Sequence, residues 1–369
     1  MTTAQTRFSE HELLADHDIE APLVVDGLRC HGGFDADGAY VSPRTLHRWP
    51  AIRAWEAQRV EQFGTPILDV PLDTWPEHFP SVAQSAFLLR HGVPEPVIGE
   101  LTRIGTVEGF GGMLRMLPTP PFERCFEEGV DGTAIAHIDG GLFEAHARDE
   151  AGFGEEAGHD RMWFAARDIA FEHPDVEDQT ARMLVRMGIG AAPGAAPAPP
   201  PARALPDDID PDLEVVAGRM IGLLLIEISA FHGFRWAETL LADDGLVAGE
   251  GRAAELVAHI RADETPHVAW LRTALSEMRD RTWVGTGGRR HPGTEMIGRL
   301  WERALEHSVV LRRREHLQMV MGEIETAVGG RPDAADLLEE MLALGSVVRR
   351  ADGSVVDAGD AGEAGEAVR

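Results

Sequence analysis

The stretch "HIRADETPHVAWL" (259–271) decides the fold that the sequence predicts. As a helix it places Ile260, Val268 and Leu271 on one apolar face, and Glu264 and His267 fall on that same face. Burying a carboxylate and an imidazole costs on the order of several kcal/mol unless another group compensates their lost hydration. This helix therefore requires a partner for both side chains.

The same spacing of an acid and a histidine occurs earlier, in "GEEAGHDRMW" (154–163). Here Glu156 and His159 stand three residues apart, as Glu264 and His267 do. On a helix this spacing puts both side chains on one face, where they can hold one metal ion. Because each motif also begins with a second acid, the chain contains EExxH and DExxH on two predicted helices.

A helical centre for two metals needs two further carboxylates, one on each remaining helix. Glu227 in "GLLLIEISAF" is the first, because without a partner it would leave a charge in the most apolar helix. It lies 20 residues before the predicted turn near 247 and Glu264 lies 17 after it, so an antiparallel pair brings them level. Glu238 shares a face with Glu227 but lies about three turns away, and we rank it second.

The second carboxylate is Glu108 in "LTRIGTVEGFGGML". Its competitors lie in 137–150, a segment that we interpret as an exposed helix start; they are His137, Asp139, Glu144, His146 and Glu150. The glycines around Glu108 leave two readings open, namely space beside the metals for a substrate or close helix packing.

The ordered pattern Glu108, Glu156–His159, Glu227, Glu264–His267 resembles the ferritin-like di-iron carboxylate superfamily over roughly residues 95–281. The resemblance implies a four-helix core in which Glu156 and Glu264 bridge or chelate two metals. His159 and His267 would each bind one metal, and Glu108 and Glu227 would complete the set. It also implies that Asp263 hydrogen-bonds the outer nitrogen of His159, and Glu155 that of His267.

We expect an all-α fold with extra helices at both ends of this bundle. Residues 1–78 read as a mixed extension with a hairpin and one short helix, and 79–346 as the ferritin-like helical domain. A Pro/Ala-rich linker occupies 190–211, and 347–369 reads as a disordered acidic tail. The predicted helices are 47–62, 80–92, 95–116, 142–173, 177–188, 211–243, 251–281, 293–327 and 333–345. Pro266 either kinks its helix or marks a new one starting at Asp263.

Composition narrows the class of protein. The net charge of −28 argues against nucleic acid and anionic membranes as partners, and no apolar run is long enough for a membrane span. Two cysteines supply neither a disulfide framework nor an iron–sulfur centre, so we expect a cytoplasmic protein. The absence of lysine and asparagine fits a GC-rich genome and has no functional meaning by itself.

Carboxylate and imidazole ligands suit two iron ions, and manganese or a mixed pair suits them as well. The resemblance therefore implies a di-metal oxidase or oxygenase that uses O2 to oxidise a small organic substrate, as a monomer or small homo-oligomer. Reducing electrons, if needed, come from a separate protein or from the substrate. The alternatives are an acyl-carrier-protein desaturase-like enzyme, although "EEAGH" and "DETPH" lack that family's usual residues, and a ferroxidase or iron-storage protein. Ribonucleotide reductase is disfavoured because Tyr40, the single tyrosine, lies far from the motifs in the sequence.

Overall fold

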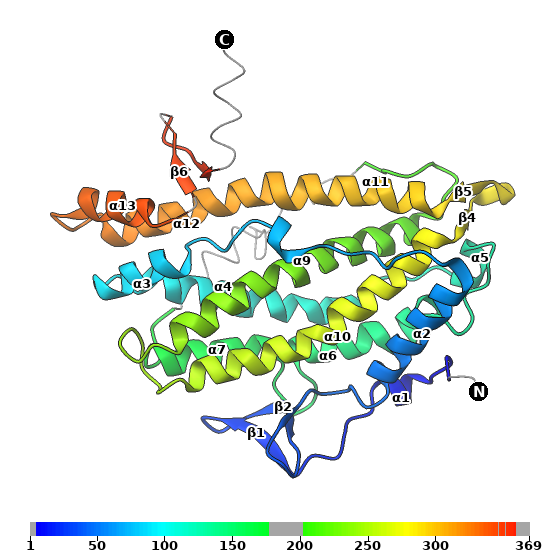
Figure 1. Cartoon of the computed structure of the whole chain (residues 1–369), viewed down its shortest axis with the longest axis horizontal. Coiled ribbons are helices and arrows are strands. Elements are labelled where there is room, and N and C mark those ends of the chain that lie inside the picture. Colours follow the sequence, from blue (N-terminus) through cyan, green and yellow to red (C-terminus); the bar gives the residue numbers. More distant parts are fainter. Residues whose placement is uncertain (1–4, 177–201, 346, 351, 359–369) are drawn as a thin grey trace, which may run out of the picture.

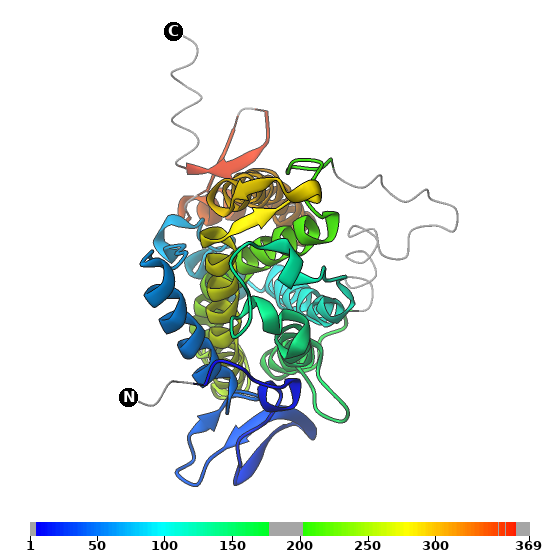
Figure 2. The same cartoon turned by 90° about the vertical axis from the view of Figure 1, so that its right-hand side faces the viewer.

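A computed structural model describes residues 5–176, 202–345, 347–350 and 352–358. Within these residues the chain is mostly helical, with a few short strands (Figure 1). The view of Figure 2 shows the N-terminal sheet, in blue, below the central helices and α11 and α12, in orange, above them. Among the residues described, none of the helices has the length and apolar content required to cross a membrane.

Five helices build the centre of the molecule. Helix α4 packs against α7, α7 against α10, and α10 against α9. Their bounds are Glu95–Gly109 (α4), Phe143–Ala151 (α6), His159–Ala170 (α7), Pro211–Leu241 (α9) and Arg252–Asp280 (α10). The α9 side chains are apolar on almost every face, which is the composition of a helix enclosed by others.

The predicted helix 142–173 is wrong in its middle, where the chain leaves the helical path. Helices α6 and α7 lie end to end in Figure 1, and the loop 152–158 separates them. Gly152 and Gly154 have φ of 76° and 63°, a region that favours glycine. A side chain at Gly158 would collide with the Glu150 carbonyl oxygen at 2.6 Å. Three glycines in seven residues therefore form a loop where the acid–histidine spacing suggested a helix.

Helix α10 runs without interruption through Pro266. Proline removes one backbone donor from the helix and costs about 3 kcal/mol in an exposed helix interior. Here the ring is buried, so packing offsets that cost. The prediction that a new helix starts at Asp263 is therefore wrong.

The N-terminal residues form a small sheet and a long helix beside the bundle. The antiparallel strands β1 to β3 lie in the order β1-β2-β3, and α2 packs against α10. The bounds are Glu10–Leu13 (α1), Ala21–Val25 (β1), Leu28–Phe34 (β2), Tyr40–Val41 (β3), Arg48–Phe63 (α2) and Leu72–Thr74 (η1). The predicted hairpin and helix 47–62 both occur, and the sheet docks onto the loop between α6 and α7.

Short segments connect these central helices. They are Val82–Arg90 (α3), Phe110–Met116 (η2), Phe122–Cys125 (α5), Ile135–His137 (η3), Ile138–Leu142 (η4), Thr282–Val284 (β4), Thr286–Gly288 (η5) and Arg290–Pro292 (β5). The predicted helix 177–188 and most of the 190–211 linker lie outside the described residues. Residues 202–210 lead directly into α9.

The C-terminal part lies along the bundle. Helix α11 packs on α9 and α12 on α4. The bounds are Gly293–Leu305 (α11), Glu306–Arg312 (η6), Arg313–Val328 (α12), Ala334–Ala343 (α13), Val347–Arg349 (β6) and Val355–Asp357 (β7). Strands β6 and β7 pair as a hairpin with Val347 and Val355 buried, so this part of the predicted disordered tail is ordered. Residues 359–369 lie outside the described residues.

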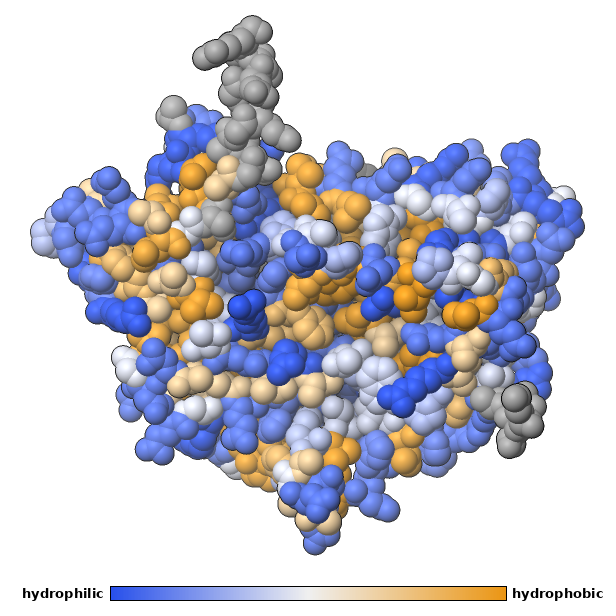
Figure 3. All heavy atoms as spheres, in the orientation of Figure 1, coloured by the Kyte–Doolittle hydropathy of each residue, from blue (hydrophilic) through white to orange (hydrophobic). Residues whose placement is uncertain are grey.

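Two apolar cores meet at the middle of the bundle. In α9 the residues up to Ile228 belong to one core and those from Phe234 belong to the other. In α10 the division falls between Ile260 and Trp270. The outer face in Figure 3 is mostly polar, with apolar residues gathered in a band below α11 and α12. The buried acids and histidines described next lie between the two cores.

Candidate metal centre

Seven acidic and histidine side chains from five helices converge where the two apolar cores meet. All except half-buried Glu108 are buried. They come from α4 (Glu108), α6 (His146, Glu150), the first residue of α7 (His159), α9 (Glu227) and α10 (Glu264, His267). Their ligand atoms form two overlapping groups, and Glu150 belongs to both.

Glu264 and Glu150 lie between the histidines. The two Glu264 oxygens face different rings, with Oε1 2.8 Å from His159 Nδ1 and Oε2 2.6 Å from His267 Nδ1. Glu150 Oε1 lies 3.6 Å from His159 Nδ1 and 3.2 Å from His267 Nδ1. Both carboxylates can therefore reach the nitrogen of each histidine, as a group that bridges two metals must.

Several buried atoms at this centre lack hydrogen-bond partners in the part of the chain that is described. Glu150 Oε1, Glu264 Oε1 and His159 Nδ1 are all in this state. Such atoms cost free energy unless something binds them. Two ligand atoms on one metal, each about 2.0–2.2 Å from it, lie roughly 3 Å apart, and several of the separations above are close to this. The donor set therefore fits metal ions.

Each of the two facing histidines also has an aspartate on its outer side. His267 Nε2 lies 2.8 Å from Asp149 Oδ2, and His159 Nε2 lies 3.6 Å from Asp263 Oδ2. A carboxylate at the outer nitrogen keeps the proton there, which leaves the inner Nδ1 free to bind a metal. Asp263 therefore lies beside the outer nitrogen of His159, as predicted, at 3.6 Å and so without the predicted hydrogen bond.

The third histidine, His146, has the opposite arrangement. Its Nδ1 accepts a hydrogen bond from the Trp270 indole N–H at 3.4 Å. Neutral His146 then carries its proton on Nε2, which lies 3.1 Å from Glu227 Oε1 and 3.4 Å from Glu150 Oε1. We therefore assign His146 as a proton-bearing neighbour of the two carboxylates, and the remaining six residues as the candidate ligands.

Burial and neighbouring charges shift the pKa values of the carboxylates at this centre. Burial raises the pKa of Glu150 well above its usual value, and the negative charges of Glu264 and Glu108 raise it further. The pKa of Glu264 is raised for the same reason, first by burial and then by Glu227. Burial would also raise the pKa of Glu227, but His146 lowers it to about 2. Perturbed acids in such proximity are typical of functional sites.

Two predicted residues lie outside this centre. Glu156 is in the loop between α6 and α7, where its Oε1 accepts a hydrogen bond from Arg29 Nη2 at 3.1 Å, and Glu155 is exposed in the same loop. Their predicted places are taken by Glu150 and Asp149, which are a Glu and an Asp on the last turns of α6. Glu156 lies outside the centre because the glycine-rich loop 152–158 interrupts the helix, and the chain re-enters the centre only at His159, the first residue of α7.

Most of segment 137–150 is buried, although Asp139 is exposed, so its interpretation as an exposed helix start is wrong. Asp149 and His146 are 0% exposed and Glu150 is 3% exposed. One signal in the sequence pointed to them: "DE" occurs at 149–150 as it does at 263–264. The two pairs occupy equivalent positions, since each Glu faces both histidines and each Asp lies behind one of them.

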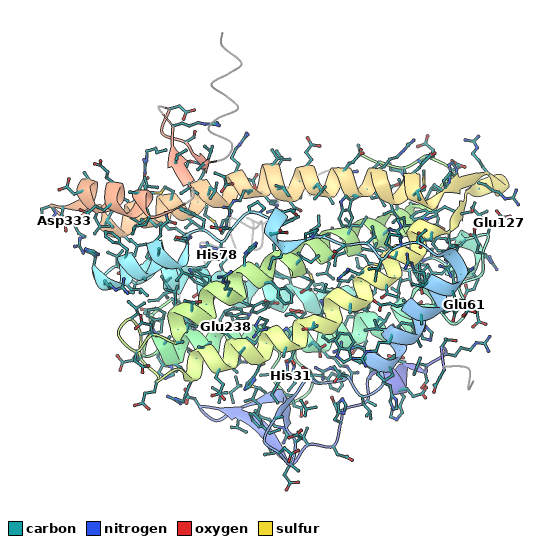
Figure 4. All side chains as sticks on the ribbon, in the orientation of Figure 1. His31, Glu61, His78, Glu127, Glu238 and Asp333 are labelled. Atoms are coloured by element: carbon teal, nitrogen blue, oxygen red, sulfur yellow. The ribbon has the colours of Figure 1, made fainter. Side chains whose placement is uncertain are left out.

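The second-ranked Glu238, and two histidines each five residues from a candidate ligand glutamate, His232 and His259, are engaged elsewhere. Glu238 accepts from Arg261, and Figure 4 shows it on α9 toward the connection to α10. His232 contacts the Leu72 carbonyl oxygen, and His259 stacks on Tyr40. The Tyr40 hydroxyl lies 2.8 Å from Asp263 Oδ2, so the tyrosine that is remote in sequence is close to this site in space.

The glycines near Glu108 serve close packing. A Cβ on Gly105 would lie 2.7 Å from Phe164, and one on Gly111 would lie 2.2 Å from Glu150. Helix α4 and η2 therefore press directly on α7 and α6. A polar cavity of about 250 Å³ lies over the loop 152–158, and its lining contains none of the seven central side chains.

Comparison of the whole chain with known proteins found no relative from which a function could be transferred. No family model matches the chain, and neither a curated protein nor a solved structure matches it. The residues of the centre and their geometry are therefore the basis for assigning a function.

Proposed function

We propose that the central cluster binds two metal ions and that the helices holding it form a ferritin-like bundle. In this arrangement α4, α6 with α7, α9 and α10 correspond to the bundle's helices. One metal would be held by Glu108 and His159, the other by Glu227 and His267, and Glu150 and Glu264 would bridge them. The observation that supports this most is the pair of Nδ1 atoms facing opposite oxygens of Glu264.

The donor set favours iron, with manganese as the other ion that suits four carboxylates and two imidazoles. We propose that the protein is an O2-dependent oxidase or oxygenase for a small organic substrate. Two ions of this kind, when bound, supply electrons to O2 and so generate an oxidant for the substrate. Storage ferritins consist of little more than the helical bundle, whereas this chain adds the sheet β1–β3, α2 and the α11–α12 layer. These additional elements favour an enzyme over a storage protein.

The protein's own residues would prepare this chemistry. The two apolar cores on either side keep water from the ligands, so charges inside the centre interact strongly. Asp149 and Asp263 keep the outer protons on His267 and His159. His146 holds a proton beside Glu227 and Glu150. Both cysteines are buried, and burial raises the pKa of their thiols, so external electrons would have to come from a partner protein or from the substrate.

Metal analysis tests this proposal directly. The purified protein, freed of metal with a chelator, would be loaded with Fe(II) without oxygen and desalted. We expect close to two iron ions per chain and rapid O2 consumption after air is admitted. One ion per chain or none, with both Fe(II) and Mn(II), would refute the two-metal centre. Two bound ions without O2 consumption would refute the oxidase.

A further inference from the structure

The N-terminal segment 29–48 touches the outer side of the candidate centre at several independent points. It approaches through the sheet β1–β3 and the start of α2, and Figure 4 shows His31 between that sheet and α10. The residues that reach inward are among the most buried polar side chains of the molecule. His31 is 1% exposed, Arg44 is 3% exposed and Arg48 is 0% exposed.

The first contact fixes the loop that introduces His159. The backbone N–H of His31 donates to the Ala157 carbonyl oxygen at 3.0 Å, and the Ala157 N–H donates to the Arg29 carbonyl oxygen at 2.9 Å. The loop is rich in glycine and therefore has little conformational preference of its own. Pairing with β2 holds Ala157 two residues before His159, so the N-terminal sheet determines where this histidine enters.

The second contact supports Asp263, the aspartate behind His159. The Tyr40 hydroxyl lies 2.8 Å from Asp263 Oδ2, and His31 Nε2 lies 3.2 Å from the same oxygen. Arg44 Nη2 lies 3.3 Å from His31 Nδ1, so this nitrogen accepts a hydrogen bond and the ring donates from Nε2. Two neutral donors thus hold one carboxylate oxygen in front of His159.

The third contact supports Asp149, the aspartate behind His267. Arg48 Nη1 lies 2.7 Å from Asp149 Oδ2, and Arg44 Nε lies 2.7 Å from Oδ1. Arg48 also donates from Nη2 to the Pro43 carbonyl oxygen at 3.1 Å, which ties the guanidinium to its own segment. Charge-assisted bonds from two arginines fix both oxygens of this aspartate.

We infer that segment 29–48 is a positioning element of the metal centre, which orients His159 through Tyr40, His31 and Asp263 and orients His267 through Arg44, Arg48 and Asp149. This inference rests on the proposed two-metal site and assigns these residues no contact with the metals. The two arms meet where Arg44 Nη2 lies 3.3 Å from His31 Nδ1, but they end in residues of different charge, the neutral Tyr40 at Asp263 and the cationic Arg48 at Asp149. Each should therefore affect the metal next to its own histidine.

A Co(II) titration of the metal-free full chain separates the two arms. Co(II) absorption reports the coordination of each ion, so binding can be followed without turnover. Tyr40→Phe removes one hydroxyl and keeps the ring that stacks on His259. Arg48→Met removes one cation from Asp149. Changes around ligand histidines cost 10- to 100-fold in affinity, and because these residues act through an aspartate we expect about 10-fold.

The matched control is Arg59→Met. Arg59 lies on the same helix as Arg48, is 2% exposed and binds Asp280 through Nε at 2.8 Å, but it does not contact Asp149 or Asp263. This variant should lose stability as Arg48→Met does and bind Co(II) as the wild type does. Arg48→Lys, which keeps the charge, should recover part of the affinity.

The expected result is that Tyr40→Phe weakens one of the two Co(II) equivalents, Arg48→Met weakens the other, and the double variant weakens both. The visible spectrum of the affected equivalent should change as well. If both variants titrate like Arg59→Met, the inference is wrong, and Tyr40→Phe decides this even if Arg48→Met does not fold. Wild-type protein that binds no Co(II) would instead refute the proposed function.

Discussion

The substitution Glu150→Gln should stabilise the metal-free protein and abolish metal binding. Glu150 is 3% exposed, and burial together with Glu264 and Glu108 raises its pKa well above the usual value. The folded protein without metal therefore bears an uncompensated cost, which a neutral side chain of the same shape removes. The same substitution removes the carboxylate that faces both His159 and His267.

The direction of that shift gives the sign of the expected effect on stability. Each unit by which folding raises a pKa corresponds to about 1.4 kcal/mol. Because a buried polar atom without a partner costs about 1–3 kcal/mol and Glu150 Oε1 is such an atom, we expect Glu150→Gln to raise the free energy of unfolding of the metal-free protein by on the order of 1–2 kcal/mol, or roughly 2–4 °C in Tm for each kcal/mol. Because the pKa is raised on folding, the penalty is absent below the unfolded value of about 4.3 and grows as the pH rises above it. The difference in the free energy of unfolding between Glu150→Gln and the wild type should therefore increase as the pH rises.

Thermal unfolding with chelator and with excess Mn(II) provides the assay. Binding adds about 2.7 kcal/mol at a metal concentration 100 times Kd, so loaded wild type should be more stable than the variant, and the order should invert with chelator. Glu156→Gln is the control, since Glu156 pairs with Arg29 at the surface, and it should follow the wild type in both conditions. A Glu150→Gln protein that is less stable than wild type without metal, yet still binds two ions, would refute this reasoning.

Other substitutions distinguish ligands from neighbours. His267→Gln should lower metal content to one ion or fewer, measured by elemental analysis after desalting, whereas His146→Gln should retain two because Trp270 places the His146 proton on the inner nitrogen. Loss of one ion in His146→Gln would make it a third histidine ligand. With about a 50-fold excess of Fe(II) over the two-metal site, the protein should consume O2 but accumulate no mineral. Hundreds of iron ions retained in a large assembly on gel filtration would favour storage.

Periodicity and burial cost predicted much of the helical frame from the sequence. The predicted helices 211–243 and 251–281 correspond to α9 and α10, because long apolar periodic segments leave little choice of structure. Glu227 and Glu264 were found by the same argument, since a charge in an apolar helix needs a partner. The weaker assignment, Glu108, was also placed at the centre.

The failure at Glu156 has a specific physical cause. A spacing rule assumes a continuous helix, and "AGFGEEAGH" contains glycines at every point where the backbone must leave it. Gly152 and Gly154 adopt positive φ, Gly158 has no room for a side chain, and all three are costly inside a helix, so together they outweigh the i, i+3 match. The earlier "DE" pair then becomes the equivalent of Asp263–Glu264, and this repetition was a better guide to the site than the EExxH spacing.

The residues that support the site from outside could not be found in this way. His31, Tyr40, Arg44 and Arg48 lie more than 100 residues from the aspartates that they contact, and no periodic pattern links them. Physical cost nevertheless requires such partners, because a fully buried aspartate behind each histidine must itself be compensated. Asp149 is compensated by two charges and Asp263 by two neutral donors. The two candidate metal positions therefore share their bridging carboxylates but differ in the electrostatic environment behind their histidines.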